Sequence, residues 1–260
     1  MRSLGRRTTQ LLRRGVPMFV TIAIIGAVSV GTYFGYVFLT TSERFAIAHI
    51  EINGEHHVSE QDVLERLGSP SGTNIFSVAT SDMERSLEQE PWIVSADVRR
   101  RLPNRLVVSV KEHEAVALVE LGRLYLVDAT GHPFKRAETG EGDAEGLKLI
   151  TGLSRDLFLE HPATARDTIA EALELMKLYT SRGKRPEVGE IHIDPRRGYT
   201  LVTHESATAI RLGHGPADNL RRRLHAFDAA WGALTEIERS DARTVFADNQ
   251  THTDRVTVSF

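Results

Sequence analysis

Histidines and carboxylates are the residues of this 260-residue chain that could bind a metal or transfer protons. The eleven histidines are scattered, and neither an HExxH motif nor an HxH pair brings two of them together. Residues 68–72 resemble the G-x-S-x-G turn of serine hydrolases, but Pro70 occupies the place of the nucleophile. Asp143 and Glu145 lie in a stretch rich in glycine and acids, which holds carboxylates poorly for acid–base catalysis. The sequence therefore predicts no catalytic residues, no metal site and no cofactor.

Charge and cysteine content narrow the class of protein further. The net charge is −3, to which five arginines in residues 1–15 contribute +5, leaving −8 for the rest of the chain. This acidic remainder argues against nucleic acid as a partner. The basic run at residues 99–101 does not change this, because strand alternation directs neighbouring side chains to different faces. The chain has no cysteine, so each domain needs a hydrophobic core of its own.

One uncharged segment, residues 16–39, determines how the chain is organised. Its 24 residues include no Asp, Glu, Lys, Arg or His. A helix of this length extends about 36 Å and can cross the roughly 30 Å hydrocarbon core of a bilayer. We therefore expect a cytoplasmic tail over residues 1–15, a transmembrane helix over residues 16–40 and two domains beyond it.

The residues that flank this segment determine its expected orientation. Five arginines and no acid precede it, whereas Glu43 and Arg44 nearly cancel after it. The positive-inside rule then keeps the N-terminus in the cytoplasm and exports residues 45–260, as a single-pass type II protein. The alternative is a cleaved signal peptide, because residues 46–48 (Ala-Ile-Ala) resemble a cleavage site. The apolar segment is, however, much longer than the apolar region of a signal peptide, which usually has about 7–15 residues.

Small residues recur on one face of the expected transmembrane helix. Ala27, Gly31 and Gly35 are spaced four residues apart, which lets a second helix approach closely. Glycine and alanine are also common in membrane helices that do not pair. Both a paired and an unpaired helix therefore remain open.

The first exported domain is expected over residues 45–114, with the element order β-α-α-β-β. Ser59 and Asp62 resemble a capping box that begins a helix. Residues 93–101 and 106–112 alternate apolar and polar side chains, as the two strands of a hairpin do.

A motif in this domain resembles the signature of a POTRA domain. Residues 90–93 (Glu-Pro-Trp-Ile) precede the hairpin, and Leu102 and Pro103 begin its turn. Behind a single N-terminal span, the arrangement is similar to the cell-division family FtsQ/DivIB. Trp92 is expected to pack in the core, with a direct partner contact as the alternative. The other matching residues are Ala96, Val98, Arg99, Leu106, Val108, Val110, Glu112 and His113.

The second exported domain is expected over residues 115–260, as a mixed β-sheet domain with two packed helices, so that the fold class is α+β. Pro162 begins one helix, and the other begins after Gly215 and Pro216. The three arginines at residues 221–223 are expected on its solvated flank, with partner contact as the alternative. Apolar residues recur along this second helix at steps of four and three, as core positions do: Leu220, Leu224, Phe227, Trp231 and Leu234.

The resemblance to FtsQ extends over this domain. Residues 194–198, residues 210–213 and Arg223-Leu224 with Phe227 look like the β-domain of that family, whereas residues 245–249 depart from its pattern. The resemblance implies a non-enzymatic divisome scaffold in the inner membrane, with most of the chain periplasmic, acting at the division septum. It implies partners of the FtsB and FtsL type, and a wider set of the FtsK, FtsW and FtsI type. We expect neither nucleic acid nor a small-molecule substrate.

The end of the chain is the expected partner-binding segment. Residues 256–260 favour a strand, and a strand at a sheet edge presents unpaired N–H and C=O groups to a partner strand. Basic side chains nearby would attract acidic partner residues and speed association. The predicted partner-binding residues are Arg255, Val256, Thr257, Val258, Ser259, Phe260, Arg196 and Arg197.

Two other functions remain open, a POTRA-containing envelope assembly factor and an anchored enzyme of cell-wall processing. An outer-membrane barrel requires many strands of about ten residues, whereas two helices are expected in the last hundred or so residues. A wall-processing enzyme requires a polar cleft with a nucleophile or metal, and no motif predicts one.

Overall fold

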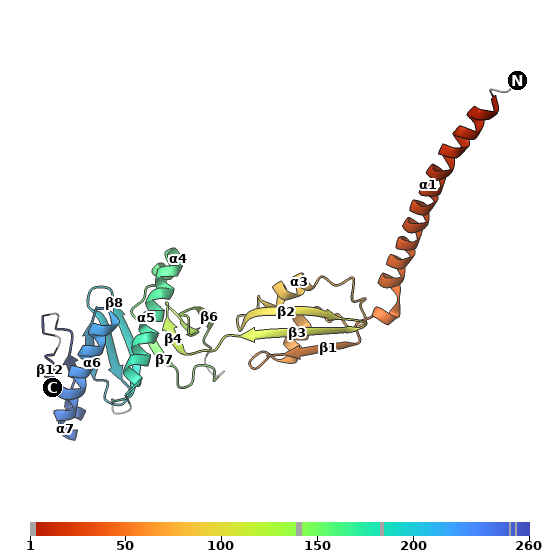
Figure 1. Cartoon of the computed structure of the whole chain (residues 1–260). Helices are drawn as coiled ribbons and strands as arrows, with labels where there is room; N and C mark the ends of the chain where they lie inside the picture. Colours follow the sequence, from red (N-terminus) through yellow and green to blue (C-terminus); the bar gives the residue numbers. More distant parts are fainter. Residues whose placement is uncertain (1–3, 139–141, 183–184, 250, 253) are drawn as a thin grey trace. The chain divides into compact units, whose positions relative to one another are not determined.

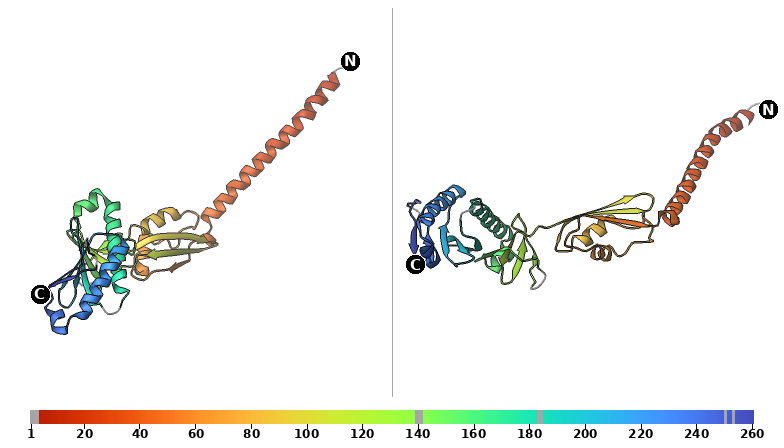
Figure 2. Two further views of the ribbon diagram at one scale, coloured as in Figure 1. Left: turned by 60° about the vertical axis from the view of Figure 1, so that its left-hand side comes forward. Right: turned by 90° about the horizontal axis from the view of Figure 1, so that it is seen from below.

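The computed structural model describes residues 4–138, 142–182, 185–249, 251–252 and 254–260. The chain divides into two compact units, Met1–Glu112 and His113–Phe260, and each is described by itself. Figures 1 and 2 show a long N-terminal helix and a small sheet in the first unit, and a larger sheet with helices in the second.

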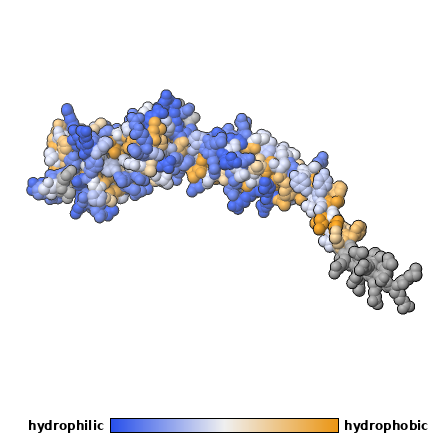
Figure 3. All heavy atoms as spheres, turned by 90° about the horizontal axis from the view of Figure 1, so that it is seen from above, coloured by the Kyte–Doolittle hydropathy of each residue, from blue (hydrophilic) through white to orange (hydrophobic). Residues whose placement is uncertain are grey.

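The first helix, α1 (Leu4–Thr41), contains the apolar segment. Its part Met18–Thr41 is long and apolar enough to cross a membrane, and none of its most apolar window is buried. In Figure 3 hydrophobic colours gather on this helix, while the visible face of both units is mostly hydrophilic. A Cβ added at Gly31 or Gly35 would meet no atom within 4 Å, so this face is open. This face fits both a paired and an unpaired helix.

The rest of the first unit has the β-α-α-β-β order that the sequence predicts. A 3-10 turn, η1 (Glu43–Phe45), joins α1 to a sheet of three strands in the order β1-β3-β2. Strand β3 lies in the middle, parallel to β1 and antiparallel to β2. The elements are β1 (His49–Asn53), α2 (Glu60–Arg66), α3 (Thr80–Leu87), β2 (Ile93–Arg101) and β3 (Arg105–Glu112).

Local sequence signals explain these elements. The Ser59 side chain accepts a hydrogen bond from the backbone N–H of Asp62 at 3.1 Å and caps α2, as predicted. Leu106 and Val108 on alternate positions of β3 are fully buried, because one face of the sheet is covered by the helices. Trp92 is 5 % exposed, which confirms that it packs in the core.

The second unit is built on a mixed sheet of nine strands in the order β12-β11-β10-β9-β8-β7-β4-β5-β6. Strands β4 (Ala117–Glu120), β5 (Leu124–Val127) and β6 (Pro133–Arg136) form a meander at one end. The central strands are β7 (Lys148–Thr151), β8 (Val188–Asp194), β9 (Gly198–Thr203) and β10 (Ala209–Gly213). Strands β11 (Thr244–Phe246) and β12 (Thr257–Ser259) complete the other end.

Two helical crossovers place the long helices on one face of this sheet. The chain leaves β7, forms α4 (Arg155–Glu160) and α5 (Pro162–Thr180), and returns parallel in β8. It leaves β10, forms α6 (Ala217–Ala233) and α7 (Glu236–Asp241), and returns parallel in β11. Both crossovers move in the same direction from strands of the same sense, and right-handed crossovers then lie on the same side.

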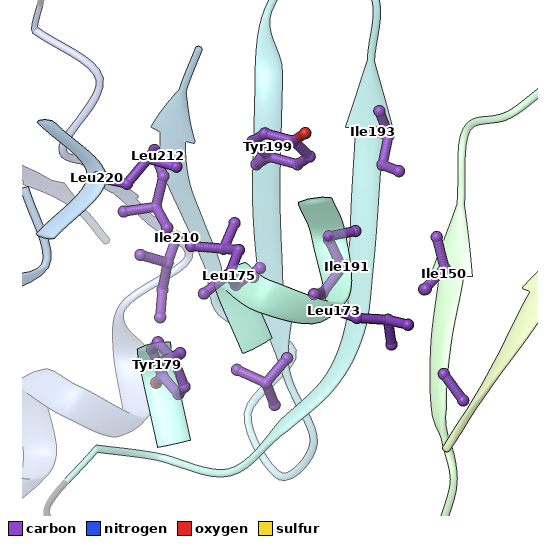
Figure 4. Packing of buried hydrophobic residues seen from close by; sticks show 14 of the residues in the cluster. Ile150, Leu173, Leu175, Tyr179, Ile191, Ile193, Tyr199, Ile210, Leu212 and Leu220 are labelled. Carbon is purple, nitrogen blue, oxygen red and sulfur yellow. The ribbon is translucent and has the colours of Figure 1, made fainter. Parts of the chain in front are cut away.

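The core of the second unit lies between this sheet and the helices α5 and α6. Figure 4 shows Leu173 and Leu175 of α5 among side chains of the neighbouring strands. Phe227 of α6 is fully buried, and its ring centroid lies 6.4 Å from that of Tyr179. This packing fills one face of the sheet and leaves the other face without a helix among the described residues.

The two long helices begin where the sequence predicts, at Pro162 and after Pro216. The short helices α4 and α7 and the short strands β4 and β6 were not predicted, because each has at most six residues and shows little periodicity. The arginines at 221–223 are a partial correction. Arg223 is only 3 % exposed, and its Nη1 donates to the carbonyls of Leu212 at 2.6 Å and His214 at 2.7 Å.

Candidate functional site at the edge of the second sheet

Strand β12 is the edge strand at one end of the nine-stranded sheet, as Figure 1 also shows near the C-terminus. It pairs antiparallel with β11, with Val258 opposite Val245 and Thr257 opposite Phe246. A terminal strand therefore exists, shorter than the predicted residues 256–260, and among the described residues nothing pairs with its outer side. An edge of this kind presents a row of unpaired backbone groups.

The direction of the backbone groups of β12 follows from one contact. The carbonyl of Ser259 accepts a hydrogen bond from the backbone N–H of Arg243 at 2.9 Å, so Ser259 directs its carbonyl toward the side of β11. Neighbouring residues of a strand direct their backbone groups to opposite sides. The N–H and C=O of Val258 therefore point to the open edge, where a partner strand would meet them.

The side chains of β12 divide between the two faces of the sheet. Val256 and Val258 are half-buried and pack against the core. Thr257 and Ser259 are exposed on the other face, and Phe260 is 57 % exposed at the chain end. The edge therefore combines open backbone groups with an exposed aromatic side chain, a combination suited to strand addition.

Two residues that the sequence reasoning missed extend this site across the open face of the sheet. Arg211 of β10 is opposite Phe246 of β11, which is opposite Thr257 of β12, so the three side chains form one row. The guanidinium of Arg211 lies 5.2 Å from the ring centroid of Phe246, a cation–π contact. Strand alternation predicts that Arg211 faces away from Ile210, but only the strand order brings it beside Phe246.

Arg196 and Arg197 lie in the turn between β8 and β9, and both side chains are exposed. The Asp194 carboxylate accepts their backbone N–H groups at 2.7 and 3.0 Å, and these bonds lower the pKa of Asp194. Gly198 ends the turn with φ of 82°, and a Cβ there would lie 2.2 Å from the backbone carbon of Gly213. These hydrogen bonds and the Gly198 conformation define the turn, which exposes two cationic side chains.

The structure separates these two arginines from the edge strand. Residues 196–197 precede β9 and Arg255 precedes β12, and the strand registers place both positions at the same end of the sheet. Three strand spacings separate β9 from β12, about 14 Å. Residues 257–259 thus form the edge strand, with 255–256 and 260 on either side of it, while Arg196 and Arg197 form a second basic point at the same end of the sheet.

Two carboxylates, Glu112 and Asp143, make structural contacts. The Glu112 carboxylate accepts backbone N–H groups of His56, His57 and Val58 at 2.8–3.1 Å. Burial raises the pKa of Glu112, but these bonds outweigh it, so the pKa lies below its ordinary value. Asp143 forms an ion pair with Lys135 at 3.0 Å. Within the described residues, no group of three His, Cys, Asp or Glu side chains could hold a metal.

A groove of about 1060 Å³ lies between α5 and α6. Ser181 and His225 both line it, but the Ser181 hydroxyl donates to the carbonyl of Leu178 at 2.7 Å. His225 lies 3.4 Å from the guanidinium of Arg182, which is a cation and cannot orient a general base. Among the described lining residues, Ser181 and His225 therefore do not form a nucleophile–base pair.

Comparisons with known proteins agree with this architecture. The family model of the FtsQ-type POTRA domain matches residues 45–113, and that of the FtsQ/DivIB C-terminal region matches residues 115–244. The chain is 34 % identical to the cell division protein FtsQ of Anaeromyxobacter sp. strain K over 256 residues, which cover 97 % of this chain and 83 % of that protein. It is also 34 % identical to FtsQ of Myxococcus fulvus, covering 71 % of this chain and 64 % of that protein.

The chain is also similar to a relative that carries the name DivIB. The chain is 35 % identical to the cell division protein DivIB of Staphylococcus aureus over 80 residues, which cover 31 % of this chain and 18 % of that protein. The matched C-terminal model ends at Thr244, so β12 lies beyond it. With both family models adjoining along residues 45–244, this chain belongs to the FtsQ/DivIB family of cell-division proteins.

Proposed function

We propose that this chain is a non-enzymatic scaffold of the division machinery that binds partner proteins through the open edge of β12. Family membership supports a role in cell division, and α1 fits a membrane-anchored protein of that family. The proposed partners are proteins of the FtsB and FtsL type, with the FtsK, FtsW and FtsI types as further candidates. The observation that carries the proposal is the outward direction of the Val258 backbone groups at an unpaired sheet edge.

The proposed topology follows from the charges around α1. Residues 1–15 lie in the cytoplasm, residues 16–40 cross the inner membrane, and the domains over residues 45–114 and 115–260 lie in the periplasm at the septum. The five arginines before the apolar segment support this orientation through the positive-inside rule. Carbonate extraction tests the anchor, because an anchored chain stays in the membrane fraction and a cleaved one is released.

The proposed binding mode is addition of a partner strand to β12. The partner strand would form backbone hydrogen bonds with Val258, and exposed side chains such as Phe260 would contribute specificity. Arg196, Arg197 and Arg255 would attract acidic residues of the partner and accelerate encounter more than they tighten the complex.

Val258→Pro tests the proposed strand addition. Proline removes the outward-pointing N–H and obstructs a neighbouring strand, but an edge position tolerates it. We expect affinity for an FtsB-type partner to fall about tenfold or more, as loss of a hydrogen bond with added steric conflict predicts. Surface plasmon resonance with the exported region measures this, and circular dichroism confirms that the fold is kept.

Val258→Ala is the matched control for this experiment. Alanine shortens the same side chain but keeps the backbone donor, so its affinity should stay within about threefold of the parent protein. Equal affinities of Val258→Pro and the parent protein would refute strand addition at this edge.

A further inference from the structure

The first unit exposes apolar side chains at the end where α1 enters it. Among its described residues after α1, three large apolar side chains are exposed: Phe76 by 38 %, Val94 by 44 % and Leu102 by 58 %. Val94 lies at the start of β2, at the other end of the hairpin. Phe76 and Leu102 lie in two loops next to η1, residues 74–77 and 102–104, which we call the basal loops.

The first basal loop is bonded directly to the last turns of α1. Asn74 Nδ2 donates to the carbonyl of Leu39 at 2.9 Å, and the backbone N–H of Ile75 donates to the carbonyl of Phe45 at 2.8 Å. Three aromatic rings continue this connection. The centroids of Phe38 and Phe45 are 6.2 Å apart, and those of Phe45 and Phe76 are 5.2 Å apart. Phe76 therefore ends a row of rings that begins on the apolar helix.

The second basal loop is held against the same region. The carbonyl of Asn104 accepts the backbone N–H of Ala48 at 2.9 Å, a few residues after η1. Arg100 of β2, two residues before this loop, ties the strand to the first basal loop, because its Nε donates to the carbonyl of Ile75 at 2.8 Å. Leu102, at the tip of this turn, is 58 % exposed and is the most exposed of the three apolar side chains.

Basic side chains flank Leu102 on both strands. Arg101 and Arg105 are opposite each other in the hairpin register, one on each side of the turn. Arg105 shares an ion pair with Glu51 at 3.2 Å, whereas Arg101 is exposed and forms no ion pair within the described part of the chain. An apolar tip with arginines beside it is typical of a membrane-interface site, because arginine extends to lipid phosphates while apolar atoms enter the boundary region.

We propose that the basal loops dock on the bilayer surface, with Leu102 and Phe76 at the level of the lipid headgroups and Arg101 on a lipid phosphate. The inference rests on the proposed membrane anchor. Continuity with α1 favours lipid over a protein partner, since the seven residue-to-residue steps from Thr41 to Ala48 span at most about 25 Å. The Asn74–Leu39 hydrogen bond keeps the loop closer still. The docked loops would restrain how the first unit tilts on its anchor.

The absence of cysteine from the chain allows a site-specific test. The full-length variants Leu102→Cys and Ser95→Cys are each labelled with the fluorophore NBD and reconstituted in phosphatidylcholine vesicles with and without phosphatidylglycerol. Ser95 is the matched control, because it is exposed on the same hairpin about 20 Å from the turn. We expect the label at position 102, but not at 95, to shift to the blue and to be quenched several-fold more by a headgroup-level lipid quencher.

Second variants separate the proposal from its alternatives. Arg101→Glu should reduce the blue shift at position 102, most strongly in vesicles that contain phosphatidylglycerol. If labels at 102 and 95 are equally quenched in vesicles that float with the protein, the docking proposal is wrong although the anchor is right. Protein that fails to float with the vesicles contradicts the anchor itself. A label at 102 that is shielded only after a division protein is added would assign the basal loops to a protein partner and overturn lipid docking.

Discussion

The two edges of the nine-stranded sheet differ in how they are protected. Strand β6 begins with Pro133, which has no N–H to offer, and it carries Lys135 and Arg136. Strand β12 contains no proline and no lysine, and its exposed positions are Thr257 and Ser259. Proline and charged residues are the usual means by which sheet edges avoid unwanted pairing. The β6 edge therefore carries these protections, whereas the β12 edge has neither proline nor lysine.

The two edges also differ in the contacts that hold them in place. The β5–β6 loop is held by Asp128, whose carboxylate accepts the backbone N–H of Thr130 at 2.9 Å and of His132 at 3.1 Å. Asp128 also contacts His113 Nδ1 at 2.9 Å. The carboxylate network fixes the blocked edge, whereas β12 is held by its pairing with β11 and by Val256 and Val258 against the core.

The largest loss of stability is expected from a substitution in the hydrophobic core that supports the whole nine-stranded sheet, including both of its edges. Phe227→Ala removes a fully buried ring and should lower the free energy of unfolding of the second unit by about 3–5 kcal/mol. Urea unfolding followed by Trp231 fluorescence, in a Trp92→Phe background, measures it. Trp92 fluorescence in a Trp231→Phe background is the control for the first unit and should keep its midpoint. If Phe227→Ala disordered β12 and left the rest of the second unit folded, the β12 end and the β6 end of the sheet would be shown to fold separately.

The next largest effect is expected on the pairing of β12 with β11, and it tests which residues of β12 direct their backbone groups toward β11. Thr257→Pro removes an N–H that the strand alternation directs to β11, so it should weaken the pairing by about 1–3 kcal/mol. Hydrogen exchange at the amides of Thr244–Phe246 measures the loss. Val258→Pro is the comparison variant and should leave these amides protected. The reverse ranking of the two variants would mean that the outward-pointing residue has been assigned incorrectly.

A smaller effect is expected from acid at the blocked edge. Burial raises the pKa of Asp128, but hydrogen bonds from Thr130 and His132 outweigh it and lower the pKa below the ordinary value of 3.8. A lowered pKa means that the carboxylate stabilises the fold fully above that value and loses this effect as the pH falls through the folded-state pKa. We expect the amides of the β5–β6 hairpin to have lower protection factors, after correction for the intrinsic exchange rate, at pH 3 than at pH 5. Asp128→Asn should remove most of this difference, and an unchanged difference would assign it to other acids.

The smallest effect is expected from the two turn arginines. Arg196→Glu with Arg197→Glu should slow association with an acidic partner several-fold at low salt, while dissociation changes little. The effect should fade at high salt, because exposed charges are screened. Stopped-flow or plasmon-resonance rates at two salt concentrations measure it. A faster dissociation rate would instead place these residues inside the bound interface.

Much of the fold could be predicted from local signals. The apolar helix, the cap at Ser59 and the two long helices after Pro162 and Pro216 each depend on residues close in sequence. The POTRA order also follows from alternation and turn signals along a short segment. Short elements such as α4 and β6 escaped prediction, because a few residues do not establish a period.

The site was only partly predictable for a different reason. Composition indicated a strand at residues 256–260, and the structure places Thr257–Ser259 at an edge. Arg223 was expected in solvent, yet it is buried because the carbonyls of Leu212 and His214 close around its guanidinium. One row of side chains crosses three strands and consists of Arg211, Phe246 and Thr257. No local sequence pattern predicts this row, because it depends on the strand order.

By itself the sequence determined the apolar N-terminal helix, the order of elements in the first unit, the starts of the two long helices and the family, because each depends on composition or on spacing along the chain. Only the tertiary structure decided that β12 is an edge, that Val258 directs its backbone outward, and that the basal loops meet the end of α1. The physical reason is that strand order and loop contacts arise from long-range packing, which brings together residues such as Asn74 and Leu39 that are distant in sequence.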